Sequence, residues 1–210
     1  MDVDVLATHH NTYYQPLLLR ELPPSCERVL DVGCGAGEFA VRLAARAAYV
    51  DSLDRSPVMI ERARARVPAN VTCTEADVLT HPLPPEGYDA ITSVSVLHHL
   101  PLPVVLPRLA AALRPGGVLV ATALPRADLP RELPLEALAV TVNLGRRALL
   151  AGLTATGRRD PEAPDDGLMP VADPEVTVRQ VRAQASAALG ADVVVRRLLL
   201  WRYLLGWHKP

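Results

Sequence analysis

Short apolar runs alternate with segments of helical period along the chain up to residue 124. The run VLVATAL (118–124), rich in aliphatic residues, predicts a buried strand, whereas EFAVRLAARA (38–47) places Phe39, Leu43 and Ala47 on one face and predicts a helix. Strands that alternate with helices in this way predict a parallel sheet covered on both faces. The predicted strands are residues 28–32, 47–54, 70–77, 88–96 and 118–124, and the predicted helices are 13–22, 38–47, 57–66 and 104–113.

The regular alternation ends after residue 124. The remaining predicted elements are a strongly apolar helix over 132–153, a loop rich in proline and aspartate over 157–175, a helix over 177–189, and a tail over 193–209 that forms one long strand or a hairpin. No internal repeat or domain linker interrupts the pattern. Residues 1–210 are therefore expected to form a single domain.

Three local patterns refine these expectations. Pro107 is expected in the first turn of its helix, where the missing amide hydrogen does no harm. The sequence RPGG (114–117) predicts a turn before the fifth strand. In the tail, Trp201, Tyr203 and Trp207 recur at every second or fourth position, so we expect them on one side of a strand, as core or as an oligomer face.

Composition and charge narrow the classes of function. Half of the 210 residues are hydrophobic and the net charge is −1, so we expect a globular chain without the basic surface that nucleic acid or an anionic membrane requires. No apolar run is long enough for a membrane helix. The three cysteines form neither a disulfide framework nor a zinc motif, so we expect no metal site and a cytoplasmic location.

The most informative stretch is VLDVGCGAGEFA (29–40), where three glycines alternate directly after a buried strand. A glycine-rich turn between a strand and a helix lets a ligand touch the backbone, because no Cβ intervenes. A dinucleotide fingerprint that starts at Gly33 would need glycine at position 38, but Glu38 stands there. A carboxylate would repel a pyrophosphate, so the turn favours a ligand that is not anionic at this point.

The motif DVGCGAG resembles the acid-x-Gly-x-Gly-x-Gly signature of class I S-adenosylmethionine-dependent methyltransferases. By this resemblance, Asp31 lies near the ammonium group of the cofactor's methionine part. The resemblance also implies that Gly33, Cys34, Gly35 and Gly37 supply close backbone contact to the cofactor.

The resemblance extends to LRPGGVLV (113–120) and to the ending LLLWRYLLGWHKP. It implies an α/β fold with a doubly wound, mostly parallel seven-stranded sheet, helices on both faces and an antiparallel C-terminal strand. It also implies an N-terminal cap over residues 1–24 and a helical and loop insert over residues 125–175 that covers the substrate. Within this insert, the acidic loop at 160–173 is expected to be a mobile lid, with a disordered segment as the alternative.

The stretch VDSLDRSPVMIERAR is similar to the part of the family signature that follows the second strand. A carboxylate at Asp54 can accept both ribose hydroxyls of the cofactor. Arg55 and Met59 are then expected along the adenine side. The family usually has no acid where Asp51 stands, so Asp51 is expected to be solvated.

The stretches TEADVLT and SVSVLHHLPLP follow the third and fourth strands and complete the expected cofactor site. By resemblance, Asp77 hydrogen-bonds the adenine amino group and the Val78 amide meets a ring nitrogen. Ser93 and Val94 line the methionine end. Acids at the carboxyl ends of successive strands lie where ligands bind in open α/β sheets.

His98 and His99 are the candidate catalytic residues. An imidazole is well suited to accept a proton near neutral pH, although a base is needed only when the methyl acceptor starts protonated. Adjacent residues cannot both face the site, so we expect His98 toward the cofactor and His99 toward the substrate; capping or packing is the alternative for each.

The segment THHNTYYQP (8–16) precedes the first helix. His10, Tyr13 and Tyr14 combine aromatic surface with polar tips, which suits the mouth of a substrate site, although plain packing is the alternative for the tyrosines. The apolar insert over residues 125–175 separately predicts a small, partly apolar methyl acceptor.

Three functions remain open from the sequence. The first is a methyltransferase that acts on a small metabolite, as a monomer or homodimer. The second is a fold that binds S-adenosylmethionine but has another activity, such as a cyclase, or an accessory role. The third is a nucleotide-dependent oxidoreductase.

Overall fold

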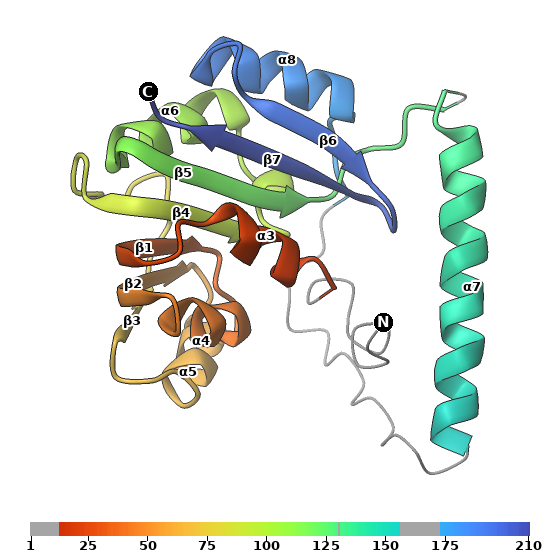
Figure 1. Cartoon of the computed structure of the whole chain (residues 1–210), viewed down its shortest axis with the longest axis horizontal. Helices are drawn as coiled ribbons and strands as arrows, with labels where there is room; N and C mark the ends of the chain where they lie inside the picture. The colour runs from red at the N-terminus through yellow and green to blue at the C-terminus, as the bar shows by residue number, and fades with distance from the viewer. Residues whose placement is uncertain (1–12, 130, 156–172) are drawn as a thin grey trace.

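A computed structural model describes residues 13–129, 131–155 and 173–210. The strands form one seven-stranded sheet in the order β3-β2-β1-β4-β5-β7-β6 (Figure 1). The first five strands pair in parallel, and β7 is antiparallel to both of its neighbours. The expected mostly parallel seven-stranded sheet with an antiparallel C-terminal strand is confirmed. The strands are β1 (Cys26–Val32), β2 (Ala47–Asp54), β3 (Val71–Glu75), β4 (Tyr88–Val94), β5 (Leu113–Ala123), β6 (Val194–Leu198) and β7 (Arg202–His208).

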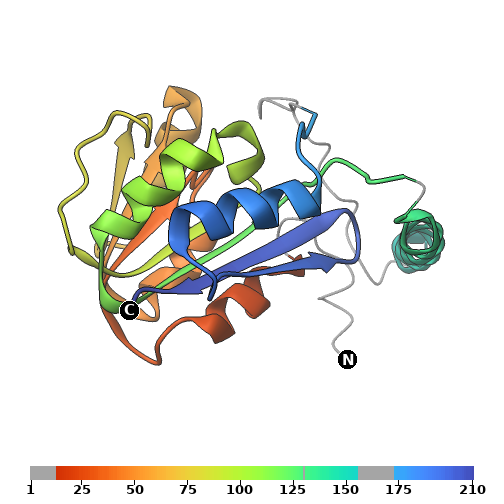
Figure 2. The same ribbon diagram turned by 90° about the horizontal axis from the view of Figure 1, so that it is seen from above.

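Helices cover both faces of the sheet and divide the core into two hydrophobic clusters. One cluster contains Leu18, Leu43 and Ile60 from three helices, and the other contains Leu106 and Val181 from two. Figure 2 shows α6 and α8 on one side of the sheet and α3 on the other. The helices are α3 (Gln15–Glu21), α4 (Glu38–Ala44), α5 (Pro57–Arg64), α6 (Leu102–Ala112), α7 (Leu133–Ala155) and α8 (Val178–Leu189), with a short 3₁₀ helix, η1 (Leu97–His99).

The position of Pro107 differs from the expectation. It lies in the interior of α6, beyond the first turn, where it cannot donate the usual backbone hydrogen bond. The side chain is exposed, while Val105, Leu106 and Leu109 on the other face are fully buried. The helix therefore keeps its place because its apolar face is packed, even though one backbone bond is missing.

Two further expectations about the last strands are corrected. Residues 114–117 do not form a separate turn but belong to β5, where the register against β4 shifts and Gly116 adopts a φ of +74°. The tail is a hairpin whose turn contains Leu200 and Trp201, both at positive φ. Trp201 therefore does not share a strand face with Tyr203 and Trp207, which are buried in the core.

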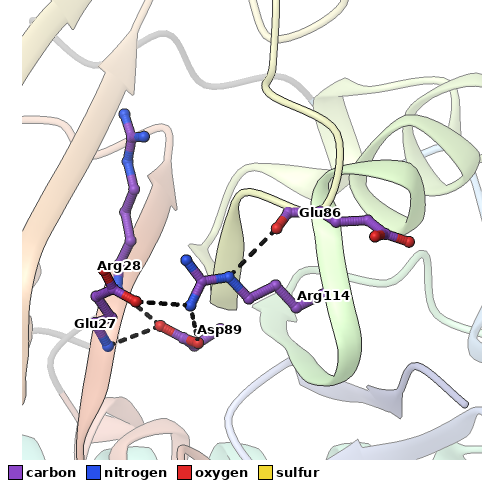
Figure 3. Close-up of polar contacts among 5 residues, drawn as sticks. All are labelled: Glu27, Arg28, Glu86, Asp89 and Arg114. Atoms are coloured by element: carbon purple, nitrogen blue, oxygen red, sulfur yellow. Dashed lines mark hydrogen bonds and ion pairs between the residues drawn. The ribbon is translucent and has the colours of Figure 1, made fainter.

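A polar network joins the amino-terminal ends of β1, β4 and β5 (Figure 3). Asp89 Oδ2 accepts hydrogen bonds from the backbone amides of Glu27 and Arg28, both at 2.7 Å. The Arg114 guanidinium pairs with Asp89 at 2.8 Å and with Glu27 at 3.0 Å, and its Nε donates to the Glu86 carbonyl at 3.3 Å. This edge of the sheet is thus held together by charge-assisted bonds.

Asp51 is not the solvated acid that we expected. Its Oδ2 accepts from Arg28 Nε at 2.7 Å and from the Tyr88 hydroxyl at 3.0 Å, so it joins β1, β2 and β4. The Arg28 guanidinium also lies over the Tyr88 ring, 5.3 Å from its centre. Asp51 therefore has a structural role, and this explains why an acid stands at a position where the family pattern has none.

The insert between β5 and α8 begins and ends at neighbouring positions beside the sheet. The Arg126 amide donates to the Val176 carbonyl at 2.8 Å, so the ends of the insert are adjacent, and Glu132 pairs with Arg197 at 3.4 Å. From there α7 stands away from the sheet (Figures 1 and 2). Its exposed apolar side chains are Leu133, Leu138, Val140, Val142, Leu144 and Leu149. Across the described residues, no helix combines the length and apolar character needed to cross a membrane.

Candidate active site

A cavity of about 570 Å³ opens at the carboxyl ends of β1 to β4. This is the size and place at which open α/β sheets bind small ligands. Its walls come from the segments that follow each of the four strands and from η1. The expected site residues that line it are Gly33, Gly35, Asp54, Arg55, Met59, Asp77, Val78, Val94 and His99.

The three glycines after β1 all have positive φ but differ in what surrounds them. A Cβ at Gly33 would lie 2.2 Å from Val96 Cγ2, so the cavity wall closes on this residue. A Cβ at Gly37 would lie 2.9 Å from Val67 Cγ1, away from the lining of the cavity. Nothing lies within 4 Å of a Cβ at Gly35, which lines the cavity. Gly35 thus leaves room for a ligand, while Gly37 allows close packing.

Asp54 holds the glycine turn in place. Its Oδ2 accepts from the Gly35 amide and its Oδ1 from the Ser56 amide, both at 2.9 Å. The second bond fixes the start of α5, where the Ser56 hydroxyl in turn accepts from the Met59 amide at 3.4 Å. Each carboxylate oxygen has a second lone pair, so both can still accept a ligand hydroxyl.

Asp31 is a buried acid next to the cavity wall, since its neighbours in the chain, Val32 and Gly33, line the cavity. The Thr92 hydroxyl donates to its Oδ1 at 3.0 Å, but its Oδ2 is buried without a hydrogen-bond partner. Burial raises the pKa of Asp31 to about 7, the nearby charge of Asp54 adds to the rise, and the Thr92 bond opposes it. A cation or strong donor brought to this oxygen would relieve an unfavourable buried charge.

The two neighbouring histidines differ in their position relative to the cavity, and His98 is not on the side of the cofactor where we expected it. His99 lines the cavity, whereas His98 does not, although their rings are 3.9 Å apart. Burial, with smaller contributions from His99 and Arg202, lowers the pKa of His98 to about 4, and its Nδ1 is buried without a partner. Burial and the charge of Arg55 also lower the pKa of His99. Both imidazoles are therefore neutral near pH 7.

Several expected site residues lie outside the cavity lining. Ser93 is fully buried and donates to the Val32 carbonyl at 3.0 Å, which ties β4 to β1. The Cys34 thiol is buried, and burial raises its pKa. Tyr14 is a core residue whose hydroxyl donates to the Leu199 carbonyl at 2.6 Å, and Tyr13 packs edge-on against it. Burial raises the pKa of Tyr14 to about 12. His10 lies outside the described residues.

Sequence reasoning missed part of the wall. Leu79, Ser95, Val96 and Leu100 also line the cavity. Ser95 has a φ of +58°, an uncommon conformation for a residue with a Cβ, and its amide donates to the Thr122 carbonyl at 2.7 Å. The available signal was position alone, because these residues follow the same strand ends as the residues that we did identify.

Similarity to known proteins bears on the family. A family described as a methyltransferase domain matches residues 29–117. An uncharacterized methyltransferase of Mycobacterium bovis is 32% identical over 202 residues, which cover 95% of this chain and 96% of that protein. A trans-aconitate 2-methyltransferase of Methylobacterium radiotolerans is 42% identical over 106 residues, which cover 49% of this chain and 40% of that protein.

The fold is shared with a solved methyltransferase. The N-methyltransferase NodS from Bradyrhizobium japonicum, in complex with S-adenosyl-L-homocysteine, aligns with a TM-score of 0.63 and 19% identity over 98% of this chain and 90% of that one. Together, the sheet order and the cavity at the glycine turn define the class I methyltransferase architecture. Given the nearly full-length Mycobacterium bovis relative, this chain belongs to the class I S-adenosylmethionine-dependent methyltransferases.

Proposed function

We propose that this methyltransferase acts on a small, partly apolar metabolite, with its cofactor in the cavity at the carboxyl edge of the sheet. The observation that carries the proposal is the set of acids at three neighbouring strand ends. Asp54 and Asp77 line the cavity, and Asp31 lies directly beside its wall with an unpartnered buried oxygen.

The residues present fit S-adenosylmethionine. Asp31 would receive the ammonium group, which would stabilise the charge that burial disfavours. The open space at Gly35 would accommodate the cofactor next to the backbone. Asp54 would accept the ribose hydroxyls, while Asp77 and the Val78 amide would meet the adenine. When bound, the cofactor supplies a methyl group already activated by its sulfonium.

The protein's main contribution to the reaction is then orientation. Holding the two reacting groups in line can supply roughly 7–11 kcal/mol of barrier reduction. Val96 and Leu100, on either side of η1, line the cavity together with His99, and this apolar surface supports a partly apolar acceptor. A neutral His99 has one ring nitrogen that can take a proton from a hydroxyl acceptor. We therefore assign the role of base to His99 in preference to His98.

Residues 125–175 are the proposed cover of the acceptor site. In support, the insert leaves the sheet at the end of β5, on the same edge as the cavity, and α7 carries exposed leucines and valines. Two similar proteins support a small acceptor, since one is a trans-aconitate 2-methyltransferase and another a 27-O-demethylrifamycin SV methyltransferase. Slower hydrogen exchange in α7 when an acceptor joins S-adenosylhomocysteine would support the cover, and unchanged exchange would contradict it.

The test of cofactor placement is Asp54→Ala, with exposed Asp192→Ala as its control. We expect calorimetry to show S-adenosylhomocysteine binding weakened by roughly 1–3 kcal/mol in Asp54→Ala, because the ribose hydroxyls lose their acceptor. Circular dichroism must accompany the measurement, since the Gly35 and Ser56 amides lose theirs as well. Equal affinity in the two folded variants would contradict the placement.

The test of methyl transfer is the appearance of S-adenosylhomocysteine when the protein is incubated with S-adenosylmethionine and a panel of small hydroxyl, amine and carboxylate acceptors. His99→Gln should lower single-turnover methyl transfer and leave cofactor affinity within a factor of about three, if His99 acts as the base. Equal loss of affinity and turnover would assign His99 to the cofactor instead.

A further inference from the structure

The turn that follows β3 forms one side of the cavity and is ordered by its own hydrogen bonds. Asp77 Oδ1 accepts from the Leu79 amide at 2.8 Å, and the Asp77 carbonyl accepts from the Thr80 amide at 3.0 Å and the His81 amide at 2.8 Å. Asp77, Val78 and Leu79 line the cavity. The Leu79 bond occupies one carboxylate oxygen of Asp77, so the direction of the other depends on how the turn is held.

Arg108 holds this turn from a different element. Its Nε donates to the Val78 carbonyl at 3.0 Å, and its Nη2 donates to the His81 carbonyl. These two carbonyls lie at either end of the turn, so one guanidinium spans it. Charge-assisted bonds of this kind are shorter and stronger than neutral ones.

The guanidinium is itself well fixed. Arg108 is partly buried on α6, between Leu106 and Leu109, which are both fully buried against the sheet. The helix cannot shift without disturbing that packing. The Val78 carbonyl is therefore held against a rigid element, and this fixes the orientation of the Val78 backbone and the adjacent Asp77.

We propose that Arg108 is a positioning residue for base recognition, which holds the turn so that Asp77 and the Val78 amide face the edge of the cofactor's base. The inference rests on the proposed function, since it takes the adenine to lie against this turn. Arg108 does not line the cavity, so its effect passes through the turn and not through ligand contact.

Arg64 offers a matched control, because it bonds the backbone of β3, the strand that precedes the turn. Arg64 of α5 donates through Nε at 3.2 Å and Nη2 at 3.0 Å to the carbonyl of Cys73 in β3. It also makes two guanidinium bonds to the backbone, both to one carbonyl, but it supports the strand and not the turn, and it does not line the cavity. Loss of the Arg64 bonds should affect stability without affecting recognition of the base.

The experiment compares the full-length protein with Arg108→Met and Arg64→Met, which keep the apolar stem and remove the guanidinium. Calorimetry measures binding of S-adenosylhomocysteine and of S-inosylhomocysteine, in which an oxo group replaces the adenine amino group. The wild-type protein should prefer the adenine form by roughly tenfold or more, because a site built for a donor leaves buried groups unpaired with the analogue. Arg108→Met should lose most of that preference, and Arg64→Met should retain it.

The outcomes distinguish failure of the positioning role of Arg108 from failure of the proposed function. A wild-type preference that survives in folded Arg108→Met overturns the positioning role and leaves the cofactor site intact. No preference in the wild-type protein removes Asp77 and Val78 from base recognition and overturns the inference with it. Absence of S-adenosylhomocysteine binding overturns the proposed function itself. If Arg108→Met does not fold, the same measurement is made on Arg108→Lys. One ammonium cannot span both carbonyls, so this variant should show a preference for the adenine form between those of the wild type and a protein without the contact.

Discussion

Asp31→Asn should stabilise the ligand-free protein and weaken cofactor binding at the same time. The pKa of Asp31 rises from 3.8 to about 7 on folding, chiefly because the carboxyl is buried. The groups that face it are the Thr92 hydroxyl, the Asp54 carboxylate and the buried thiols of Cys34 and Cys73. None of these is a cation, so in the absence of ligand the charged form of Asp31 is disfavoured.

The sign and size follow from linkage. A raised pKa means that the folded state binds the proton more tightly, so the stabilisation is complete below pH 3.8 and is lost as the pH rises through about 7. Each pKa unit is worth about 1.4 kcal/mol, which gives a total of about 4 kcal/mol. Asparagine does not titrate. The stability of Asp31→Asn relative to the wild type should therefore increase by roughly 2–3 kcal/mol between pH 5 and pH 8.

Urea unfolding of both proteins at pH 5, 6.5 and 8 measures this difference, with exposed Asp192→Asn as the control. Calorimetry gives the second half of the prediction. Wild-type affinity for S-adenosylhomocysteine should fall as the pH drops below about 7, since the ammonium needs a deprotonated Asp31. The variant should bind more weakly at pH 8 and lose this component of the pH dependence. A stability difference that does not change with pH would refute the reasoning.

Four more substitutions test the site and the scaffold. Gly35→Ala should cost about 1–2 kcal/mol of stability, because its φ is positive, and should weaken S-adenosylhomocysteine binding. Gly37→Ala should cost more stability, about 3 kcal/mol, because its Cβ would also crowd Val67. Equal effects of the two substitutions on binding in folded proteins would contradict the distinction. Tyr14→Phe should lower the free energy of unfolding by about 1 kcal/mol through loss of its hydroxyl bond and leave kcat/KM unchanged, which urea titration and steady-state kinetics check. Asp89→Ala should lower the free energy of unfolding by about 2–3 kcal/mol, since two backbone amides lose their acceptor. The affinity for the cofactor should stay unchanged at both high and low salt.

The elements and the place of the site could be predicted because they depend on local patterns. The strand over 47–54 has the predicted bounds, since a short apolar run between a helical pattern and a Ser-Pro helix start is a local signal. The glycines after β1 and the acids at the carboxyl ends of β1, β2 and β3 were recognisable because parallel strands bring these ends to one edge. Pattern and chain direction were sufficient for this part of the fold.

The functions of individual side chains depended on contacts between segments far apart in the chain. Gly35 and Gly37 are alike in sequence and differ only in what a Cβ would meet, which packing of α5 decides for Gly37. His98 and His99 are neighbours, and only the tertiary arrangement places one of them in the cavity wall. Tyr14 was expected at the substrate mouth, but its hydroxyl is bonded to the turn of a hairpin at the other end of the chain.

The sequence alone therefore determined an α/β sheet, a glycine turn and a row of acids, because backbone preference and hydrophobic period depend on residues that are close together in the chain. Only the folded protein assigned Asp51 to the scaffold and Arg108 to the turn beside the cavity. Hydrogen bonds and burial involve partners that no local pattern identifies. The charge state of Asp31 belongs to the same group, since its pKa depends on the water that folding removes and on the groups that replace it.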